Sequence, residues 1–241
     1  MRIPRIYLDL PMSADAIIQL DERSAHYLVN VLRLREGAEV VLFNGSEHEF
    51  LGKVENLFTK SGSVMIKEVR TVNTESKLHT HMGIGLSRGE RMDYVVQKTT
   101  ELGVNIIQPL HTEFCEVKLD KKRELKKLEH WQQVSISASE QCGRIRPPEI
   151  REPVSLQGWL ESSLECDKKF LLDQQQESVL QNAIYPASVA LLIGPEGGLS
   201  AKEKALALSQ GFDGVKLGAR TLRTETAPVA ALSLFQFLWG S

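Results

Sequence analysis

Apolar and polar residues alternate in short runs along residues 3–70, which is the pattern of half-buried strands. One helical stretch interrupts these runs, with Ser24 placed to cap it and Gly37 placed to end it. Small packages of strands often close into barrels. We therefore predict a β-barrel domain over residues 1–72. Its expected strands cover residues 6–10, 16–20, 40–43, 50–57 and 64–69.

The rhythm changes after a polar stretch at residues 71–77. Strand-like and helical runs now alternate, which is typical of an α/β domain with a mostly parallel sheet. The last helical run, residues 226–238, is apolar on nearly every side and is expected to be buried or to form a subunit contact. This α/β domain is predicted over residues 73–241. Its strands are expected at 82–86, 104–110, 170–173, 189–193 and 215–217. Its other helices are expected at 91–102 and 201–209, and one or two helices at 119–139.

Two glycine-containing turns in the C-terminal part each lie between a strand-like run and a helix start. They are Gly194-Pro-Glu-Gly-Gly198 and Leu217-Gly-Ala-Arg220. Ser200 is placed to cap the helix after the first turn, and Thr224 or Thr226 the helix after the second. Glycine lets bare backbone groups approach a ligand. Because open α/β sheets bind ligands at strand ends, the two turns predict one shared pocket.

Two segments of the chain partly fit known nucleotide-binding motifs, but neither fits completely. Gly83-x-Gly85-x-x-x-Gly89 has a spacing one residue too long for a dinucleotide fingerprint, so a strand end that tolerates glycine is the favoured interpretation. The turn at residues 194–198 lacks the Gly-Lys-Ser/Thr ending of a P-loop. An ordinary strand-to-helix turn would explain it alone, but the second turn beside it favours a binding pocket.

Composition and charge exclude few classes of function, but they indicate the cellular compartment. The chain has 29 Lys and Arg against 31 Asp and Glu, a net charge of −2, so any nucleic-acid site must be a local basic patch. Three cysteines without metal-ligand spacing predict neither a disulfide framework nor a metal site. With no apolar N-terminal segment and no spanning run, we expect a cytoplasmic protein without a membrane partner.

Charged residues follow the second glycine turn. Arg220 and Arg223 flank Leu222 just before the helix start, and Glu225 comes next. A planar guanidinium can hold a phosphate or the edge of a base through two parallel hydrogen bonds. A purely structural Arg–Glu pair explains the same residues equally well, so both interpretations stay open at this point.

Two other groups of charged residues are candidates for contacts with nucleic acid. The loop after the helix predicted at 119–139 carries Glu140 and Arg144, although a solvated helix end is a fair alternative. The lysine-rich run 118–127 also contains acidic residues, and we interpret it as a solvated helix face. A basic set falls on the predicted barrel: Arg2, Arg5, Arg23, Arg33 and Arg35.

Together these stretches resemble the RsmE family of 16S ribosomal RNA uridine-N3 methyltransferases, members of the SPOUT class. The resemblance runs essentially end to end. Its most specific parts are Gly194-Pro-Glu-Gly-Gly198, Leu217-Gly-x-Arg220 and Leu222-Arg-x-Glu-Thr-Ala227. It also includes His26 with Val31-Leu32-Arg33, Gln97-Lys-Thr-Thr-Glu-Leu-Gly-Val104, Glu140-Gln141 and Arg144.

The resemblance implies a fold, a cofactor and partners. Residues 1–72 would form a PUA-like β-barrel for RNA docking, and residues 73–241 a SPOUT domain with a trefoil-knotted, mostly parallel sheet that binds S-adenosylmethionine. The protein would be a cytoplasmic homodimer with its active site near the subunit interface. Its substrate would be 16S rRNA, within the 30S subunit, methylated on N3 of a uridine.

The resemblance and the placement of residues beside the glycine turns together suggest the site. N3 of uridine carries a proton, so we expect Arg223 to orient or polarise the base while Glu225 or Glu140 accepts that proton. No metal is expected. The residues assigned to the cofactor are Leu172, Ile193, Gly194, Pro195, Gly197, Gly198, Leu217, Gly218, Leu222 and Arg223. Those assigned to RNA are Arg5, Arg23, Arg33, Arg88, Arg144 and Arg220.

Two other classes of function remain as alternatives. A non-catalytic RNA-binding protein of ribosome assembly would bind RNA without S-adenosylmethionine, and the intact pair of glycine turns argues against it. A metabolic enzyme could use residues 194–198 to hold a phosphate or nucleotide, and the missing P-loop lysine argues against that.

Overall fold

The computed structural model describes residues 3–116, 120–162, 165–176 and 185–240. The chain divides into two compact units, the first comprising Met1–Glu75 with Ser139–Pro147 and the second Ser76–Ala138 with Pro148–Ser241. The sequence placed the boundary at residue 72. The segment 139–147 belongs with the first unit, to which the Glu140 and Arg144 side chains and the Arg144 carbonyl are hydrogen-bonded. Among the described residues, no helix is long and apolar enough to cross a bilayer.

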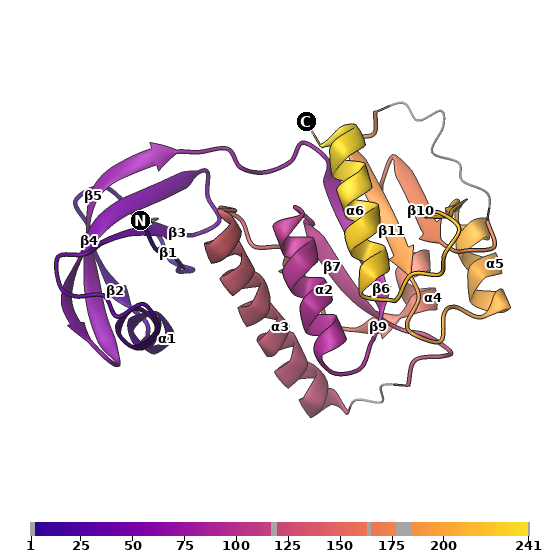
Figure 1. Cartoon of the computed structure of the whole chain (residues 1–241), viewed down its shortest axis with the longest axis horizontal. Helices are drawn as coiled ribbons and strands as arrows, with labels where there is room; N and C mark the ends of the chain where they lie inside the picture. Colours follow the sequence, from indigo (N-terminus) through magenta and orange to yellow (C-terminus); the bar gives the residue numbers. More distant parts are fainter. Residues whose placement is uncertain (1–2, 117–119, 163–164, 177–184, 241) are drawn as a thin grey trace. The chain divides into compact units, whose positions relative to one another are not determined.

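A curled five-stranded sheet forms the first unit (Figure 1). Its order is β1 (Arg5–Tyr7), β3 (Glu39–Phe43), β4 (His48–Phe58), β5 (Ser61–Thr71) and β2 (Ile17–Leu20). The pairing of β1 with β3 is parallel and the other three pairings are antiparallel. The predicted PUA-like, strand-rich domain is confirmed, as a half-barrel: among the described residues the sheet runs from β1 to β2 without a ladder joining these two edges. Its core includes Ile6, Leu28, Leu42, Phe50, Val54 and Ile66.

The helix of this unit begins earlier than predicted. Asp21 caps α1 (Glu22–His26), because its carboxylate accepts a hydrogen bond from the Ser24 amide at 2.7 Å. The predicted cap, Ser24, is therefore wrong: an aspartate at this position also interacts favourably with the helix dipole. The helix continues as a π-helical turn, η1 (Tyr27–Val31), after which Arg33 adopts a φ of +54°.

A seven-stranded sheet forms the second unit. Its order is β12 (Asp213–Val215), β10 (Lys168–Leu172), β11 (Ser188–Ile193), β6 (His79–Gly85), β7 (Ile106–His111) and β8 (Glu149–Ile150), with β9 (Val154–Ser155) also on β7. Every pairing in it is parallel, so the predicted parallel α/β sheet is confirmed. The helices are α2 (Glu90–Glu101), α3 (Lys121–Cys142), α4 (Leu156–Glu161), α5 (Ala201–Ser209) and α6 (Thr226–Trp239). The trefoil knot stays a prediction.

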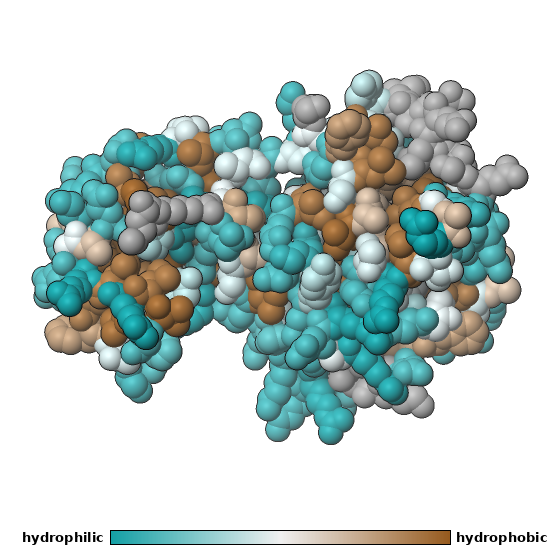
Figure 2. All heavy atoms as spheres, in the orientation of Figure 1, coloured by the Kyte–Doolittle hydropathy of each residue, from teal (hydrophilic) through white to brown (hydrophobic). Residues whose placement is uncertain are grey.

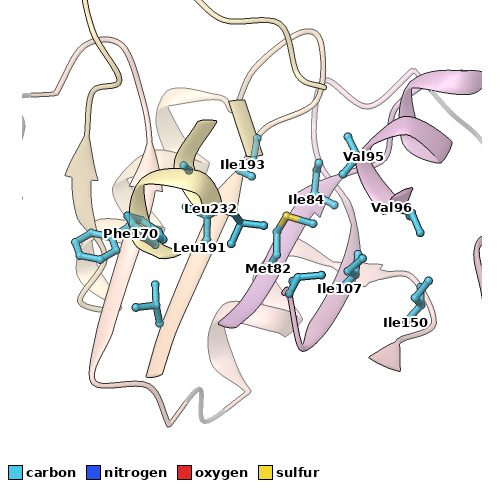
Figure 3. Close-up of a cluster of buried hydrophobic side chains, with 14 of the residues drawn as sticks. Met82, Ile84, Val95, Val96, Ile107, Ile150, Phe170, Leu191, Ile193 and Leu232 are labelled. Carbon is cyan, nitrogen blue, oxygen red and sulfur yellow. The ribbon is translucent and has the colours of Figure 1, made fainter. Parts of the chain in front are cut away.

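Helices cover both faces of this sheet. On one face, Met82, Ile84 and Leu191 of the strands meet Val95 of α2 and Leu232 of α6 (Figure 3). The opposite face is covered by α4 and α5, whose buried residues pack on alternate strand positions. Because both faces of the strands are buried, they form nearly continuous apolar runs in the sequence, which is why these runs were visible there.

The glycines of β6 serve close packing. A Cβ on Gly83 would lie 2.4 Å from the Trp159 ring, and one on Gly85 would lie 2.4 Å from the Pro195 ring. Neither distance is tolerable, so the strand can be covered this closely only if it lacks side chains there. Gly85 thereby allows the turn at residues 194–198 to lie directly against β6.

His81 of β6 is buried, and its position predicts a pH dependence of stability. Trp159 Nε1 donates a hydrogen bond to His81 Nε2 at 3.2 Å, which requires a neutral ring. Burial, with a smaller contribution from Arg151, lowers the pKa of His81 from 6.5 to about 4. Between these values the unfolded chain binds a proton that the folded chain does not, so stability falls as the pH falls through this window. The full difference corresponds to about 3 kcal/mol.

Urea denaturation at several pH values between 4 and 7 measures this dependence. The His81→Gln variant keeps an acceptor for Trp159 but does not titrate, so its free energy of unfolding should fall less steeply with pH than that of the parent. Parallel curves for the parent and His81→Gln would contradict the prediction.

Candidate functional site

A cavity of about 550 Å³ opens at the carboxyl ends of three neighbouring strands, β10, β11 and β12. Leu172, Ile193 and Val215 end these strands and form apolar walls. Residues of both glycine turns complete the lining. The two turns therefore share one cavity at strand ends, as the sequence predicted.

The first glycine turn is held by its own backbone. Gly198 has a φ of +71° and donates a backbone hydrogen bond to the Pro195 carbonyl at 2.8 Å. A Cβ on Gly194 would lie 3.0 Å from the Gly198 carbonyl carbon, which is closer than most Cβ contacts, so glycine favours this tight closure. The predicted capping box follows directly, with Ser200 and Glu203 exchanging hydrogen bonds of 2.8 and 3.3 Å.

The second turn leads from β12 into α6. The helix begins at Thr226 with Glu225 at the N-cap position and no side-chain cap. The predicted threonine caps are therefore wrong, because the carbonyl of Arg223 already accepts the amides of Thr226 and Ala227 at 2.9 and 3.0 Å. The Gln174 side chain donates to the Arg220 carbonyl at 2.5 Å, which joins the loop after β10 to this turn.

Charged side chains of both signs surround the cavity. Its cations are Arg91, Lys204 and Arg223, and its carboxylates are Asp173, Glu196 and Glu225. Lys204 lies 3.0 Å from Asp173, and the Arg91 guanidinium lies 2.6 Å from Glu196. Burial acts to raise the pKa of Glu196, but hydrogen bonds from backbone amides and from Arg91 outweigh it, so this pKa lies below its ordinary value. Glu196 therefore stays ionised at neutral pH.

Glu225 is the carboxylate with the loosest partners. Its oxygens lie 3.9 Å from the Arg223 guanidinium and 4.0 Å from that of Arg91. Its side chain is 19% exposed, whereas that of Arg223 is 79% exposed. Among the described residues Glu225 has no closer hydrogen-bonding partner, so this carboxylate is available to a ligand.

Most residues predicted for the cofactor meet at this cavity. Those that line it are Leu172, Ile193, Gly194, Pro195, Gly198, Leu217, Leu222 and Arg223. Gly197 and Gly218 belong to the same turns but not to the lining. At Gly197 a Cβ would lie 2.8 Å from that of Phe114, so this glycine makes room for a neighbouring loop.

Sequence reasoning missed part of the lining. Asp173 is the last residue of the strand predicted at 170–173 and Gln174 follows it, so the rule that ligands bind at strand ends could have found both. Arg91 lies in the first turn of α2, far from both glycine turns in the sequence, and no local signal marks it. The other missed residues are Glu196, Leu199, Lys204, Val215, Thr221, Thr224 and Ala227.

Glu140, the second candidate for proton acceptor, lies in the first unit. Its carboxylate accepts hydrogen bonds from the Tyr7 amide and from the Arg23 side chain, both at 3.0 Å. Burial raises the pKa of Glu140 above its ordinary value, although both hydrogen bonds and the positive charge of Arg23 act to lower it. This carboxylate is therefore engaged in a buried ion pair, and it is not among the residues that line the cavity.

Two arginines predicted to contact RNA are buried in the same unit. Arg144 pairs with Glu75 at 2.7 Å, and only 6% of its side chain is exposed. Arg5 pairs with Glu49, donates to the Arg144 carbonyl at 2.9 Å and packs over the Phe43 ring. Their guanidinium groups are thus used within the fold.

The other predicted RNA contacts reach the surface. Arg33, Arg88 and Arg220 are exposed, and Arg23 is partly exposed beside Glu140. Arg88 is also paired with Glu116 at 3.1 Å.

Residues 121–127 of the lysine-rich run form the start of α3, where hydrophilic residues gather on the surface (Figure 2), while residues 118 and 119 lie outside the described residues. Lys121 pairs with Glu152 at 2.6 Å, and Arg123 lies 3.5 Å from Asp120. Local pairing of this kind supports the interpretation of the run as a solvated helix face.

Two domain-family models match the chain. A model of an RNA methyltransferase domain matches residues 74–236, more than half of the chain. A model of an RNA methyltransferase PUA domain matches residues 20–62. Together with the half-barrel, the parallel sheet and the cavity, these matches define the protein as an RNA methyltransferase with an N-terminal PUA domain.

Relatives along the full length narrow this class. Ribosomal RNA small subunit methyltransferase E of Buchnera aphidicola subsp. Schizaphis graminum is 34% identical and aligns 99% of this chain with 98% of its own. The structure of ribosomal RNA small subunit methyltransferase E from Neisseria gonorrhoeae, bound to S-adenosyl methionine, superposes with a TM-score of 0.92 at 33% identity over 99% of both chains. A Legionella pneumophila protein in complex with the cofactor SAM gives a TM-score of 0.96 at 39% identity over 100% of both chains. The chain belongs to the ribosomal RNA small subunit methyltransferase E family, which confirms the resemblance seen in the sequence.

Proposed function

We propose that this protein transfers a methyl group from S-adenosylmethionine to N3 of a uridine in the 16S rRNA of the small ribosomal subunit. The observation that carries the proposal is the cavity formed by the two glycine turns at the ends of β11 and β12, the strands on either side of β10, in a chain that belongs to this family. The target atom and the rRNA are inferred from the family. We place the reaction in the cytoplasm, where bacterial ribosomes assemble.

The residues of the cavity fit S-adenosylmethionine. Its volume of about 550 Å³ suits a small-molecule cofactor, and the aliphatic side chains at the three strand ends supply apolar walls beside the charged groups. The close approach of Gly194 to Gly198 exposes backbone rather than side chains, and backbone groups can hydrogen-bond the polar parts of a nucleoside. When bound, S-adenosylmethionine supplies an electrophilic methyl group on a sulfonium.

The residues of the chain then have to deprotonate and orient the acceptor. N3 of uridine is a poor nucleophile while it carries its proton, so a base must remove that proton as the new N–C bond forms. We assign this role to Glu225, because it lines the cavity, whereas Glu140 is held by Tyr7 and Arg23. Arg223 orients the uracil ring and stabilises the negative charge that develops on it. If the Arg223→Ala variant turned over at the wild-type rate, the role assigned to Arg223 would be wrong.

RNA docking is assigned to the exposed arginines. Arg33 follows the π-helical turn of the first unit, and Arg88 and Arg220 are exposed on the second. The buried Arg5 and Arg144 are assigned a structural role in this proposal. We further infer that two copies associate through the apolar helix α6, whose Phe237 is 85% exposed. Light scattering of the purified protein tests this, and a monomer would contradict it.

The proposed reaction is tested with labelled cofactor. The purified protein is incubated with methyl-labelled S-adenosylmethionine and 30S subunits that lack their native uridine methylation, or with the free 16S rRNA. The RNA is then digested and its nucleosides are analysed. Label in 3-methyluridine would support the proposal. Label in another nucleoside would show that the enzyme methylates a different position from the one proposed. If the RNA carries no label and calorimetry detects no binding of the cofactor, the RNA-binding alternative would be favoured.

Electrostatic docking predicts a salt-dependent affinity for RNA. Each phosphate neutralised contributes about 0.7–0.9 to the slope of log K against log salt concentration. We expect Arg33→Gln to weaken binding and to reduce that slope by one such step. Arg70→Gln is the matched control, since Arg70 is exposed in the same unit but bonded to Glu68. An unchanged slope for Arg33→Gln would contradict this docking site.

A further inference from the structure

Arg91 connects two loops that line the cavity. It lies in the first turn of α2, and its side chain is 44% exposed. Its guanidinium donates a hydrogen bond of 2.6 Å to Glu196 in the first glycine turn. The Nε atom of the same guanidinium lies 4.0 Å from the Glu225 carboxylate, at the start of α6. One side chain therefore contacts a carboxylate on each of the two loops.

The first of these loops has other supports. The Arg88 amide donates to Glu196 at 3.1 Å, and the Gly198 amide closes the turn on the Pro195 carbonyl at 2.8 Å. The capping box of α5 fixes the chain immediately after the turn. Removal of Arg91 should therefore leave the backbone of the turn in place.

The Glu225 carboxylate has less support. Its neighbours of opposite charge in the described structure are Arg223 and Arg91. Arg223 extends into solvent, so it can hold one geometry only at the cost of side-chain entropy. Arg91, in contrast, is anchored at its other end on Glu196. Arg91 is thus the neighbour that can give Glu225 a defined place.

We propose that Arg91 is a positioning residue for Glu225: anchored on Glu196, it holds the Glu225 carboxylate where the proton of the acceptor must be received. This role rests on the proposed function, in which Glu225 is the base. Proton transfer needs a separation of about 2.6–3.2 Å between heavy atoms. A misplacement of about 1 Å can reduce turnover on the order of 100-fold.

Steady-state kinetics and calorimetry of three variants test this role. Arg91→Met is expected to lower kcat about 10- to 100-fold. Its KM for 30S subunits and its Kd for S-adenosylmethionine should stay within about threefold of the parent values, because the turn keeps its other supports. Arg91→Lys should recover part of kcat, since a cation remains. Lys98→Met, which removes another carboxylate-paired cation from α2, should match the parent.

A double-mutant cycle separates positioning from a general structural effect. If Arg91 acts through Glu225, adding Arg91→Met to Glu225→Gln should lower kcat by no more than about twofold further. Multiplication of the two single effects would overturn the proposal. So would a loss of cofactor affinity as large as the loss of kcat, since Arg91 would then support the cofactor turn instead.

Weakening the anchor gives an independent variant. Glu196→Gln keeps Arg91 but removes the charge that holds it, and it should lower kcat in the same direction as Arg91→Met. Failure of the parent protein to methylate any RNA would overturn the proposed function itself. An active parent with an equally active Arg91→Met variant would overturn only the role of Arg91.

Discussion

Turnover by the Glu225→Gln variant should fall by about two to four orders of magnitude at saturating substrate. Glutamine has nearly the same shape as glutamate but cannot take a proton from N3 of uridine. Glu225 makes no side-chain cap to α6, so the substitution should leave the helix and the cavity as they are. Single-turnover methylation of 30S subunits measures the effect, with the Kd for S-adenosylmethionine expected within about threefold of the parent value.

Two matched variants serve as controls for Glu225→Gln. Glu116→Gln changes an exposed carboxylate that is not among the residues lining the cavity, and it should keep the parent rate. Glu140→Gln tests the other candidate base and should keep most of the rate, since its carboxylate is engaged by Tyr7 and Arg23. A fast Glu225→Gln enzyme together with a slow, fully folded Glu140→Gln enzyme would reverse our assignment of the base.

The largest loss of stability is expected from Arg144→Met. Arg144 and Glu75 are paired at 2.7 Å with only 6% and 16% of their side chains exposed. Removing the cation leaves a largely buried carboxylate without its counter-charge, which costs about 3–5 kcal/mol. Urea denaturation should therefore show a midpoint well below that of the parent.

The cause of that loss can be checked in the same unit. Arg70 and Glu68 form a similar two-bond pair, with both bonds at 2.7 Å, but about half of each side chain is exposed. Arg70→Met should therefore cost much less stability than Arg144→Met. Adding Glu75→Gln to Arg144→Met should recover part of the lost stability, because it removes the uncompensated charge. Equal losses from the buried and the exposed pair would contradict this account.

Much of the fold could be predicted from local patterns. The helix at residues 201–209 matches its prediction because an apolar run, a capping serine and Glu203 all act within a few residues. Predictions failed where the choice depended on a neighbouring group. Asp21 rather than Ser24 caps α1, and the Arg223 carbonyl takes the amides that a threonine cap would have accepted. Local sequence offers several competing caps, and the backbone path selects one.

In the candidate site, too, some features could be predicted from local sequence and others could not. Glycine turns at strand ends were visible, because the need for glycine is a property of the local backbone. Arg91 was not visible, since its partner Glu196 lies 105 positions along the chain. Gly85 shows a further case, because the reason for a glycine there is the Pro195 ring that lies against it.

The sequence by itself determined the strand-rich first part, the parallel α/β second part, the two turns that share a cavity, and the family. These features follow from periodicity, turn chemistry and motif spacing, which act between residues close in the chain. Only the tertiary structure decided which charged residues are buried and which are exposed. Arg5, Arg33 and Arg144 look alike in the sequence, yet Arg144 is buried against Glu75 and Arg33 is exposed. The pairing and burial of a charge depend on distances across the folded chain, so only the folded structure can set them.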